Sequence, residues 1–113
     1  MPEKDLGYLE DVRKYAVRAL SYARDLTFEQ FCADTIKSDA IMRCLMVMGE
    51  AAGRLSTEAR DQFPQFEWSA MKGMRHILIH DYGRIDFTKV WDVVTTKLPQ
   101  LQAELEQYLA GIE

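Results

Sequence analysis

Residues 41–55 read IMRCLMVMGEAAGRL, and this stretch decides the fold. Its apolar residues recur every three or four positions, which places their side chains along one face of an α-helix. The apolar positions are Ile41, Cys44, Leu45, Met48, Ala52 and Leu55. We expect Ser38 or Asp39 to open this helix. We also expect Glu50, which lies close to the apolar stripe, to need a charged partner.

The residues before this stretch also carry helical patterns. Segment 5–26 has apolar residues at the same spacing and is predicted to be an amphipathic helix. Its apolar positions are Leu6, Leu9, Val12, Ala16, Ala19, Leu20 and Ala23. Thr27 and Gln30 have the spacing of a capping box, in which each side chain accepts a hydrogen bond from the backbone of the other. They predict a short helix that contains Phe28 and Phe31.

Two further helices are predicted after residue 55. Residues 68–81 form the first, and Gly83 is expected to end it in a left-handed conformation. Its side chains toward the core are Met71, Met74, Ile77 and Leu78. The second spans residues 86–108 and should be kinked or split at Pro99, which lacks the N–H of a helix interior. Since no alternating strand pattern is present, the sequence predicts an all-α, mostly antiparallel bundle of four to five main helices.

Length and composition set further limits. With 113 residues, 48% hydrophobic and 28% charged, residues 1–113 are expected to form a single helical domain. No run approaches the roughly 18 to 20 apolar residues of a membrane span, and the first residues lack a signal-peptide pattern. We therefore expect a cytoplasmic protein without membrane contact. In that compartment Cys32 and Cys44 are predicted to be reduced, buried side chains rather than a disulfide or a metal site.

The formal net charge of −4 argues against a protein that coats nucleic acid, because lysine and arginine supply that affinity. The region from Lys72 to Lys89 differs, since it holds four basic and two acidic side chains. A small, locally positive region on an acidic protein is compatible with contact to a few phosphates. It is equally compatible with the docking of an acidic partner.

Most of the residues suited to chemistry lie in residues 75–82, RHILIHDY. Arg75 offers a permanently charged fork of donors that suits a phosphate, and His80 can exchange protons near neutral pH. At about 100° per residue, Arg75 and Tyr82 fall within about 20° of each other on a helix, whereas His80 lies about 140° from Arg75. Arg75 and His80 could meet if the helix distorts, if the arginine side chain wraps around it, or if two copies face each other across a dimer.

Simpler interpretations of these residues are open as well. Both histidines could be ordinary hydrogen-bonded side chains, with Arg75 paired to Glu50 or Asp81. The histidines are four positions apart and could bind a metal together with Asp81 or Glu50, although the glutamate that follows the first histidine in zinc proteases is absent. Tyr82 could simply pack its ring at the helix end and leave its hydroxyl in water.

With these residues in view, the chain resembles the HEPN superfamily and, within it, the HepT-like toxins of toxin–antitoxin pairs. The likeness covers nearly the whole chain, and its most specific part is the Arg-x4-His-x-Tyr motif of Arg75, His80 and Tyr82. The other matching residues are Met48-Gly-Glu-Ala-Ala, Phe63-Pro64, Trp68, Val90-Trp91 and Leu98-Pro99. The position after the motif arginine is most often asparagine in close relatives and is His76 here, which leaves the role of the second histidine open.

The resemblance implies a metal-independent endoribonuclease that needs no cofactor and acts on RNA as a homodimer, with both motifs lining a shared cleft. In that case Arg75 holds the phosphate and His80 acts as general base or acid. His76 supplies a second proton carrier or orients His80. Glu50 is then a candidate to position Arg75, and Asp81 is a further supporting residue.

The resemblance also implies a partner, a small MNT-type nucleotidyltransferase that is the antitoxin of a type VII-like toxin–antitoxin system. In such pairs the antitoxin transfers AMP from ATP to the motif tyrosine, here Tyr82, and the bulky anionic adduct blocks the cleft. The alternative function is a non-catalytic helical module that binds a nucleotide or a partner protein. His80 distinguishes the two, because a binding module should tolerate glutamine there whereas a nuclease should lose turnover.

Overall fold

The computed structural model describes residues 2–112, so Met1 and Glu113, the two ends of the predicted domain, lie outside it. All regular secondary structure in residues 2–112 is helical. The longer α-helices are α1 (Glu3–Ala23), α3 (Thr35–Arg54), α5 (Trp68–His80) and α7 (Leu98–Ala110). The shorter segments are α2 (Phe28–Ala33), α4 (Thr57–Asp61), α6 (Phe87–Asp92), the 3₁₀ turn η1 (Tyr82–Arg84) and the π-helical segment η2 (Val93–Lys97).

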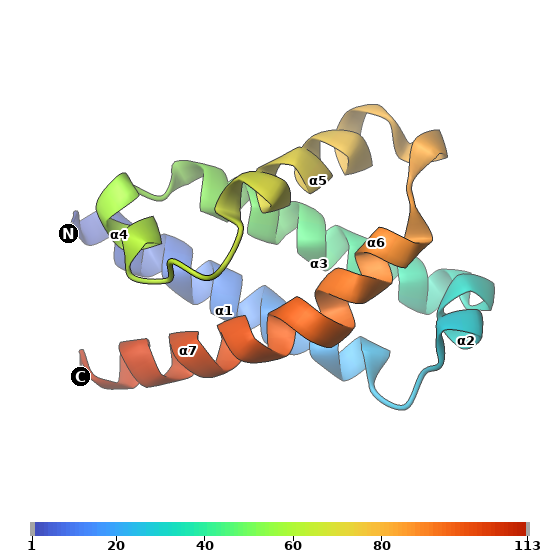
Figure 1. Ribbon diagram of the computed structural model, residues 1–113, viewed down its shortest axis with the longest axis horizontal. Coiled ribbons are helices and arrows are strands. Elements are labelled where there is room, and N and C mark those ends of the chain that lie inside the picture. Colours follow the sequence, from blue (N-terminus) through green and yellow to red (C-terminus); the bar gives the residue numbers. More distant parts are fainter. Residues whose placement is uncertain (1, 113) are drawn as a thin grey trace.

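The helices form an antiparallel bundle (Figure 1). α1 and α3 make the most extensive contact, and α5 packs on α3. Both α7 and the preceding η2 pack on α1. The two ends of the chain lie at the same end of the bundle. The predicted all-α, mostly antiparallel architecture is confirmed. Within residues 2–112, no helix combines the length and the apolar character that crossing a bilayer requires.

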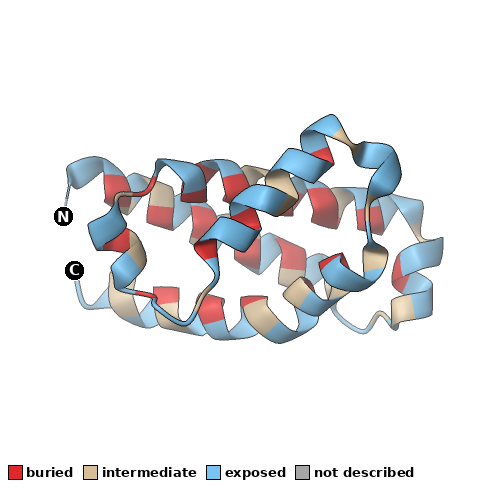
Figure 2. Cartoon of the chain, turned by 45° about the horizontal axis from the view of Figure 1, so that its top comes forward, coloured by how far each residue is buried: buried red, intermediate tan, exposed pale blue. Residues whose placement is uncertain are grey.

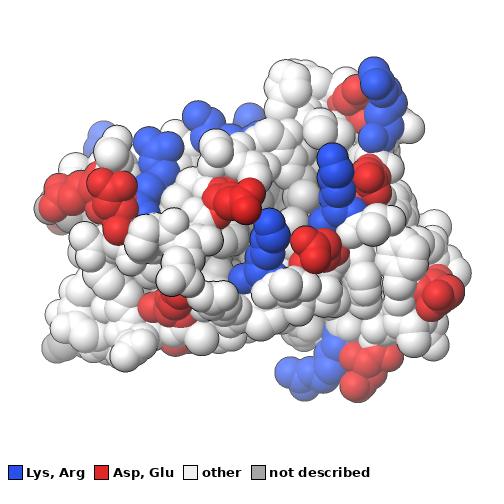
Figure 3. Space-filling view, in the orientation of Figure 1, with Lys and Arg blue, Asp and Glu red and all other residues white. Residues whose placement is uncertain are grey.

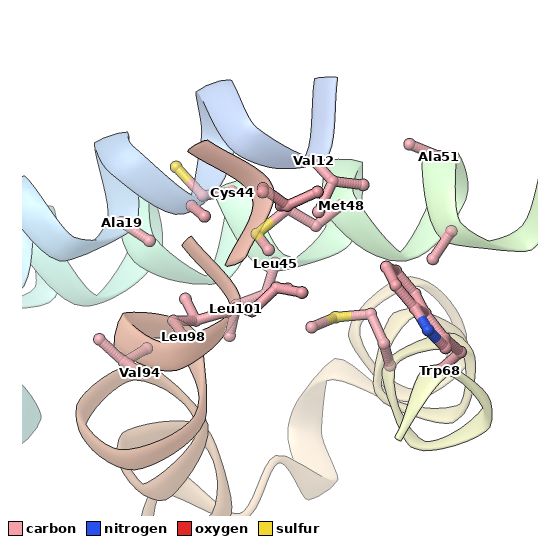
Figure 4. Packing of buried hydrophobic residues seen from close by; sticks show 14 of the residues in the cluster. Val12, Ala19, Cys44, Leu45, Met48, Ala51, Trp68, Val94, Leu98 and Leu101 are labelled. Atoms are coloured by element: carbon pink, nitrogen blue, oxygen red, sulfur yellow. The ribbon is translucent and has the colours of Figure 1, made fainter. Parts of the chain in front are cut away.

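The predicted apolar stripe of residues 41–55 lies at the centre of the core. Every member of the stripe is buried, with no more than 3% of its surface exposed. Figure 4 shows Leu45 and Met48 of α3 beside Val12 of α1 and Leu101 of α7. Burying an aliphatic side chain of this size contributes about 1.5 to 3 kcal/mol, so this layer holds the three helices together.

The start of α3 differs from the prediction. The helix begins at Thr35 rather than at Ser38 or Asp39. The reason is the side chain of Asp34, which accepts a hydrogen bond from the backbone N–H of Lys37 at 3.0 Å and so caps the helix. Asp39 therefore lies in the second turn of α3, exposed at the surface of the bundle.

Two predicted local features are present. The backbone N–H of Gln30 donates to the Thr27 hydroxyl at 3.1 Å, and that of Thr27 donates to the Gln30 side chain at 2.9 Å, which completes the capping box of α2. The break near Pro99 is also confirmed, because the chain passes from α6 through the π-helical η2 into α7, whose first turn holds Pro99. A proline cannot donate to the preceding turn, and the widened turn accommodates the missing bond.

α5 does not end as predicted, with a glycine in the left-handed conformation. α5 ends at His80, and Asp81 leaves the helical conformation with φ −143° and ψ 45°. The backbone N–H of Arg84 donates to the Asp81 carbonyl at 2.9 Å and closes η1. No glycine among residues 2–112 has a positive φ, so the prediction for Gly83 is wrong.

Two side chains predicted to be buried are exposed. Ile77 has 43% of its surface exposed, because α5 packs mainly on α3 and the second half of α5 is largely uncovered (Figure 2). Cys32 is exposed whereas Cys44 is buried, since only Cys44 belongs to the α3 stripe. Burial raises the pKa of the Cys44 thiol. Both cysteines are free thiols.

Candidate functional site

Gly49 sets how closely α5, which carries most of the candidate residues, approaches α3. A Cβ atom built on Gly49 would lie 2.6 Å from Arg75 Cβ and 3.0 Å from the Met71 carbonyl oxygen. No larger residue fits there unless α5 moves away. The absent side chain of Gly49 therefore fixes the position from which Arg75 extends. Gly49 was not predicted as a site residue, and its signal in the sequence is its place in Met48-Gly-Glu-Ala-Ala, one of the segments that carry the family resemblance.

Arg75 lies in a shallow depression of about 240 Å³ between α3 and α5. This Arg75 depression is lined by Gly49, Glu50, Gly53, Arg54, Lys72 and Arg75. Arg75 is half-buried, and its Nε atom is shielded from solvent and has no hydrogen-bond partner among residues 2–112. Three basic side chains and one carboxylate border the hollow, which gives it a net positive charge suited to a phosphate.

Neither predicted carboxylate partner pairs with Arg75. Glu50 is exposed, and its Oε1 accepts from Arg54 Nη2 at 3.1 Å. Glu50 thus has the charged partner that the sequence analysis expects, but this partner is Arg54 at the surface of the bundle. Asp81 Oδ2 pairs instead with Arg84 Nη1 at 3.6 Å. No ion pair to Arg75 is formed within residues 2–112, so its guanidinium is available to an anion from outside the chain.

The two histidines lie together on α5. The ring centroids of His76 and His80 are 4.7 Å apart, and the ring planes are tilted by 48°. Both residues are exposed, so each ring can be reached by another molecule. No group of three or more histidine, cysteine, aspartate and glutamate side chains in residues 2–112 is arranged to hold a metal ion. The structure thus presents two imidazole rings side by side on the exposed surface of α5.

Arg75 and His80 face different directions. α5 is a regular α-helix as far as His80, so the angle of about 140° between the two residues holds. The Arg75 depression includes neither histidine. Distortion of the helix therefore does not bring these two side chains together. The reach of the arginine side chain and a second copy of the chain are the routes left.

Tyr82 has a position that helix periodicity does not predict. Because α5 ends at His80, Tyr82 lies in η1, and the angle of a continuous helix does not apply to it. Tyr82 and Arg75 nevertheless both lie against α3. Its hydroxyl donates to Asp39 Oδ1 of α3 at 2.7 Å, while 53% of the residue stays exposed. The hydrogen bond to Asp39 raises the pKa of the Tyr82 phenol. Asp39 was predicted only as a helix opener, and no local signal links residues 43 positions apart.

The surface of the molecule is mixed in charge and partly apolar near the histidines. Figure 3 shows basic and acidic side chains interspersed, with no continuous basic area on the face it draws. Ile77 and Ile79 of α5 are 43% and 41% exposed. Each isoleucine is three positions from one of the histidines, so the surface of α5 that carries the two rings is bordered by apolar side chains.

Comparison with known proteins identifies the family. A sequence profile described as Ribonuclease HepT-like matches residues 7–108. The chain belongs to the HepT-like ribonuclease family. A Methanocaldococcus jannaschii protein named as a candidate RNase is 33% identical over 114 residues, which cover 100% of this chain and 94% of that protein. A Thermococcus cleftensis protein named probable ribonuclease HepT is 30% identical over 107 residues, which cover 95% of this chain and 97% of that protein.

A second M. jannaschii protein, also named as a candidate RNase, is 29% identical over 114 residues, which cover 100% of this chain and 98% of that protein. No solved structure gives a significant match. The HepT-like match includes every candidate site residue, from Asp39 to Tyr82. The family and the names of these relatives support ribonuclease activity for this HepT-like chain.

Proposed function

We propose that this HepT-like protein is a metal-independent endoribonuclease and the toxin of a type VII-like toxin–antitoxin pair. The observation that carries the proposal is the Arg75 guanidinium, which forms no ion pair with the described residues 2–112. It borders a hollow beside α5, the helix that also presents two exposed histidines. A cation for the phosphate and a proton carrier for the reacting oxygens are what phosphodiester cleavage needs. Membership of the family supports the same reaction class.

The reaction uses the 2′-hydroxyl of the RNA as the nucleophile. His80 takes the proton of that hydroxyl, the 2′-oxygen bonds to phosphorus, and the bond to the 5′-oxygen of the next nucleotide breaks. The leaving oxygen receives a proton from His76, whose ring lies 4.7 Å from that of His80. Arg75 stabilises the additional negative charge on the phosphorane. The products carry a 2′,3′-cyclic phosphate and a 5′-hydroxyl.

In this proposal a second copy of the chain completes the site. A phosphate held by Arg75 at the α3 side of α5 meets a histidine most directly when that histidine belongs to a partner subunit. A two-fold axis brings the same surface of both copies together, so each cleft receives Arg75 from one subunit and His80 from the other. The exposed Ile77 and Ile79 supply apolar area for such a contact.

The proposed antitoxin is an MNT-type nucleotidyltransferase that transfers AMP to Tyr82. The exposure of Tyr82 supports this, since a partner can bring a nucleotide to its hydroxyl. The adduct carries a phosphodiester close to the motif. That negative charge competes with the RNA phosphate for Arg75, and the nucleoside fills the cleft.

The proposed chemistry is tested by RNA cleavage with a chelator present. We expect the purified, unmodified protein to cut mixed-sequence RNA equally well with and without excess EDTA, and mass spectrometry to find 2′,3′-cyclic phosphate ends. Arg75→Ala should lose this activity and keep the circular dichroism spectrum of the wild type. Activity that EDTA abolishes and magnesium restores would contradict metal independence. No cleavage by folded, unmodified protein would favour the binding module.

A further inference from the structure

The contact between Tyr82 and Asp39 joins the motif to a different helix. The Tyr82 hydroxyl donates to Asp39 Oδ1 at 2.7 Å, across 43 positions of sequence. Asp39 is exposed in the second turn of α3, and its side chain makes no other hydrogen bond or ion pair within residues 2–112. Since 53% of Tyr82 is also exposed, a nucleotide can approach the oxygen that Asp39 holds.

A neutral tyrosine hydroxyl is a weak nucleophile, and its proton has to leave when the oxygen bonds to phosphorus. The hydrogen bond to Asp39 raises the pKa of the Tyr82 phenol, so the free phenolate is scarcer than for an ordinary tyrosine. Attack on a phosphate then depends on a group that takes the proton as the new bond forms. A carboxylate hydrogen-bonded to the substrate hydroxyl fills that role in protein kinases.

We propose that Asp39 is the residue that orients the Tyr82 hydroxyl and accepts its proton during AMP transfer, an inference that rests on the proposed modification of Tyr82. The Tyr82 oxygen attacks the α-phosphorus of ATP and forms the O–P bond. The bond from that phosphorus to the oxygen bridging to the β-phosphate breaks, pyrophosphate leaves, and the tyrosine proton goes to Asp39. The toxin thus carries part of the chemistry that inactivates it.

The other titratable neighbours of Tyr82 are engaged elsewhere. Asp81, the preceding residue, pairs with Arg84 at 3.6 Å. His80 lies on α5 with its ring against that of His76. Within residues 2–112, Asp39 is the residue to which the Tyr82 hydroxyl donates. Because Asp39 contacts the reacting oxygen directly, it is a better candidate for the proton acceptor than Asp81 or His80.

Asp39→Asn is the decisive variant, because asparagine keeps an oxygen that can accept from Tyr82 but cannot take its proton. We expect the turnover of AMP transfer from α-labelled ATP by the partner nucleotidyltransferase to fall about 100-fold. Below the phenol pKa, the residual rate should rise about tenfold per pH unit, because only the phenolate then attacks. The matched control is Asp11→Asn, which removes an exposed carboxylate from α1 and should be modified like the wild type.

A phenol titration reports on the contact without the partner. We expect the pKa of Tyr82, followed by ultraviolet difference absorbance against Tyr82→Phe, to fall toward the ordinary value of about 10 in Asp39→Asn. Circular dichroism of Asp39→Asn should match that of the wild type. Equal AMP transfer to wild type and Asp39→Asn would overturn the role of Asp39 but not the proposed modification of Tyr82. A wild type that accepts no AMP, shown by unchanged mass, would overturn the proposed modification together with it.

Discussion

Replacing His80 with alanine is expected to slow RNA cleavage by about 100- to 10,000-fold, the usual contribution of a positioned acid or base. His80 is exposed on the last turn of α5 and covers no part of the core. Its loss should therefore leave the melting temperature close to that of the wild type, so that the change in rate reports on chemistry. Single-turnover cleavage of a short RNA by the unmodified protein measures the effect.

His76→Ala is the companion variant, because His76 shares the exposed surface of α5 and contacts the His80 ring. A loss as large as that of His80→Ala would make His76 the second proton carrier, whereas a loss of only a few-fold would limit it to orienting His80. His80→Gln separates the two classes of function, since a binding module keeps its affinity. Wild-type cleavage by His80→Ala would contradict the assignment of the general base.

Gly49→Ala is expected to damage both stability and activity. The added methyl group would lie 2.6 Å from Arg75 Cβ and 3.0 Å from the Met71 carbonyl oxygen, and neither atom is the flexible end of a side chain. α5 has to move away from α3, and such overpacking costs about 1 to 3 kcal/mol. The melting temperature should fall by roughly 4 to 8 °C for each kcal/mol. Cleavage should fall as well, because Arg75 moves with α5.

Gly53→Ala is the matched control on the same helix. The three atoms nearest to a methyl group there all belong to the Lys72 side chain, at 3.7 Å or more. Alanine favours a helix interior over glycine by about 1 kcal/mol, so this variant should be as stable as the wild type or more stable. Thermal unfolding followed by circular dichroism compares the two. A Gly49→Ala protein with the melting temperature of Gly53→Ala would show that the close approach of the helices is not required.

The helices and the centre of the core could be predicted because they depend on local spacing. The stripe of residues 41–55 and the capping box of Thr27 are properties of a few consecutive residues, and both are confirmed. Ile77 shows what spacing cannot predict. Spacing identifies the faces of a helix, but it does not tell which neighbouring helix covers each face. α5 packs mainly on α3, and Ile77 stays exposed.

Much of the candidate site depends on contacts between distant segments, which the sequence pattern does not contain. The identities of Arg75 and His80 came from the motif, whereas the place of Gly49 against Arg75 follows only from how α3 and α5 pack. The bond from Tyr82 to Asp39 likewise requires η1 to lie against α3. Helix spacing gives the direction of Tyr82 relative to Arg75, but it does not identify Asp39 as the residue that the Tyr82 hydroxyl contacts.

Mixed subunits give the most direct test that Arg75 and His80 act on one phosphate from different copies of the chain. Arg75→Ala and His80→Ala protomers carrying different affinity tags are co-expressed, and dimers bearing both tags are isolated and assayed on RNA. Each single variant should be inactive alone, whereas a mixed dimer has one intact composite site of two and should regain about half of the wild-type rate. Mixed dimers as inactive as their parents would contradict the shared site.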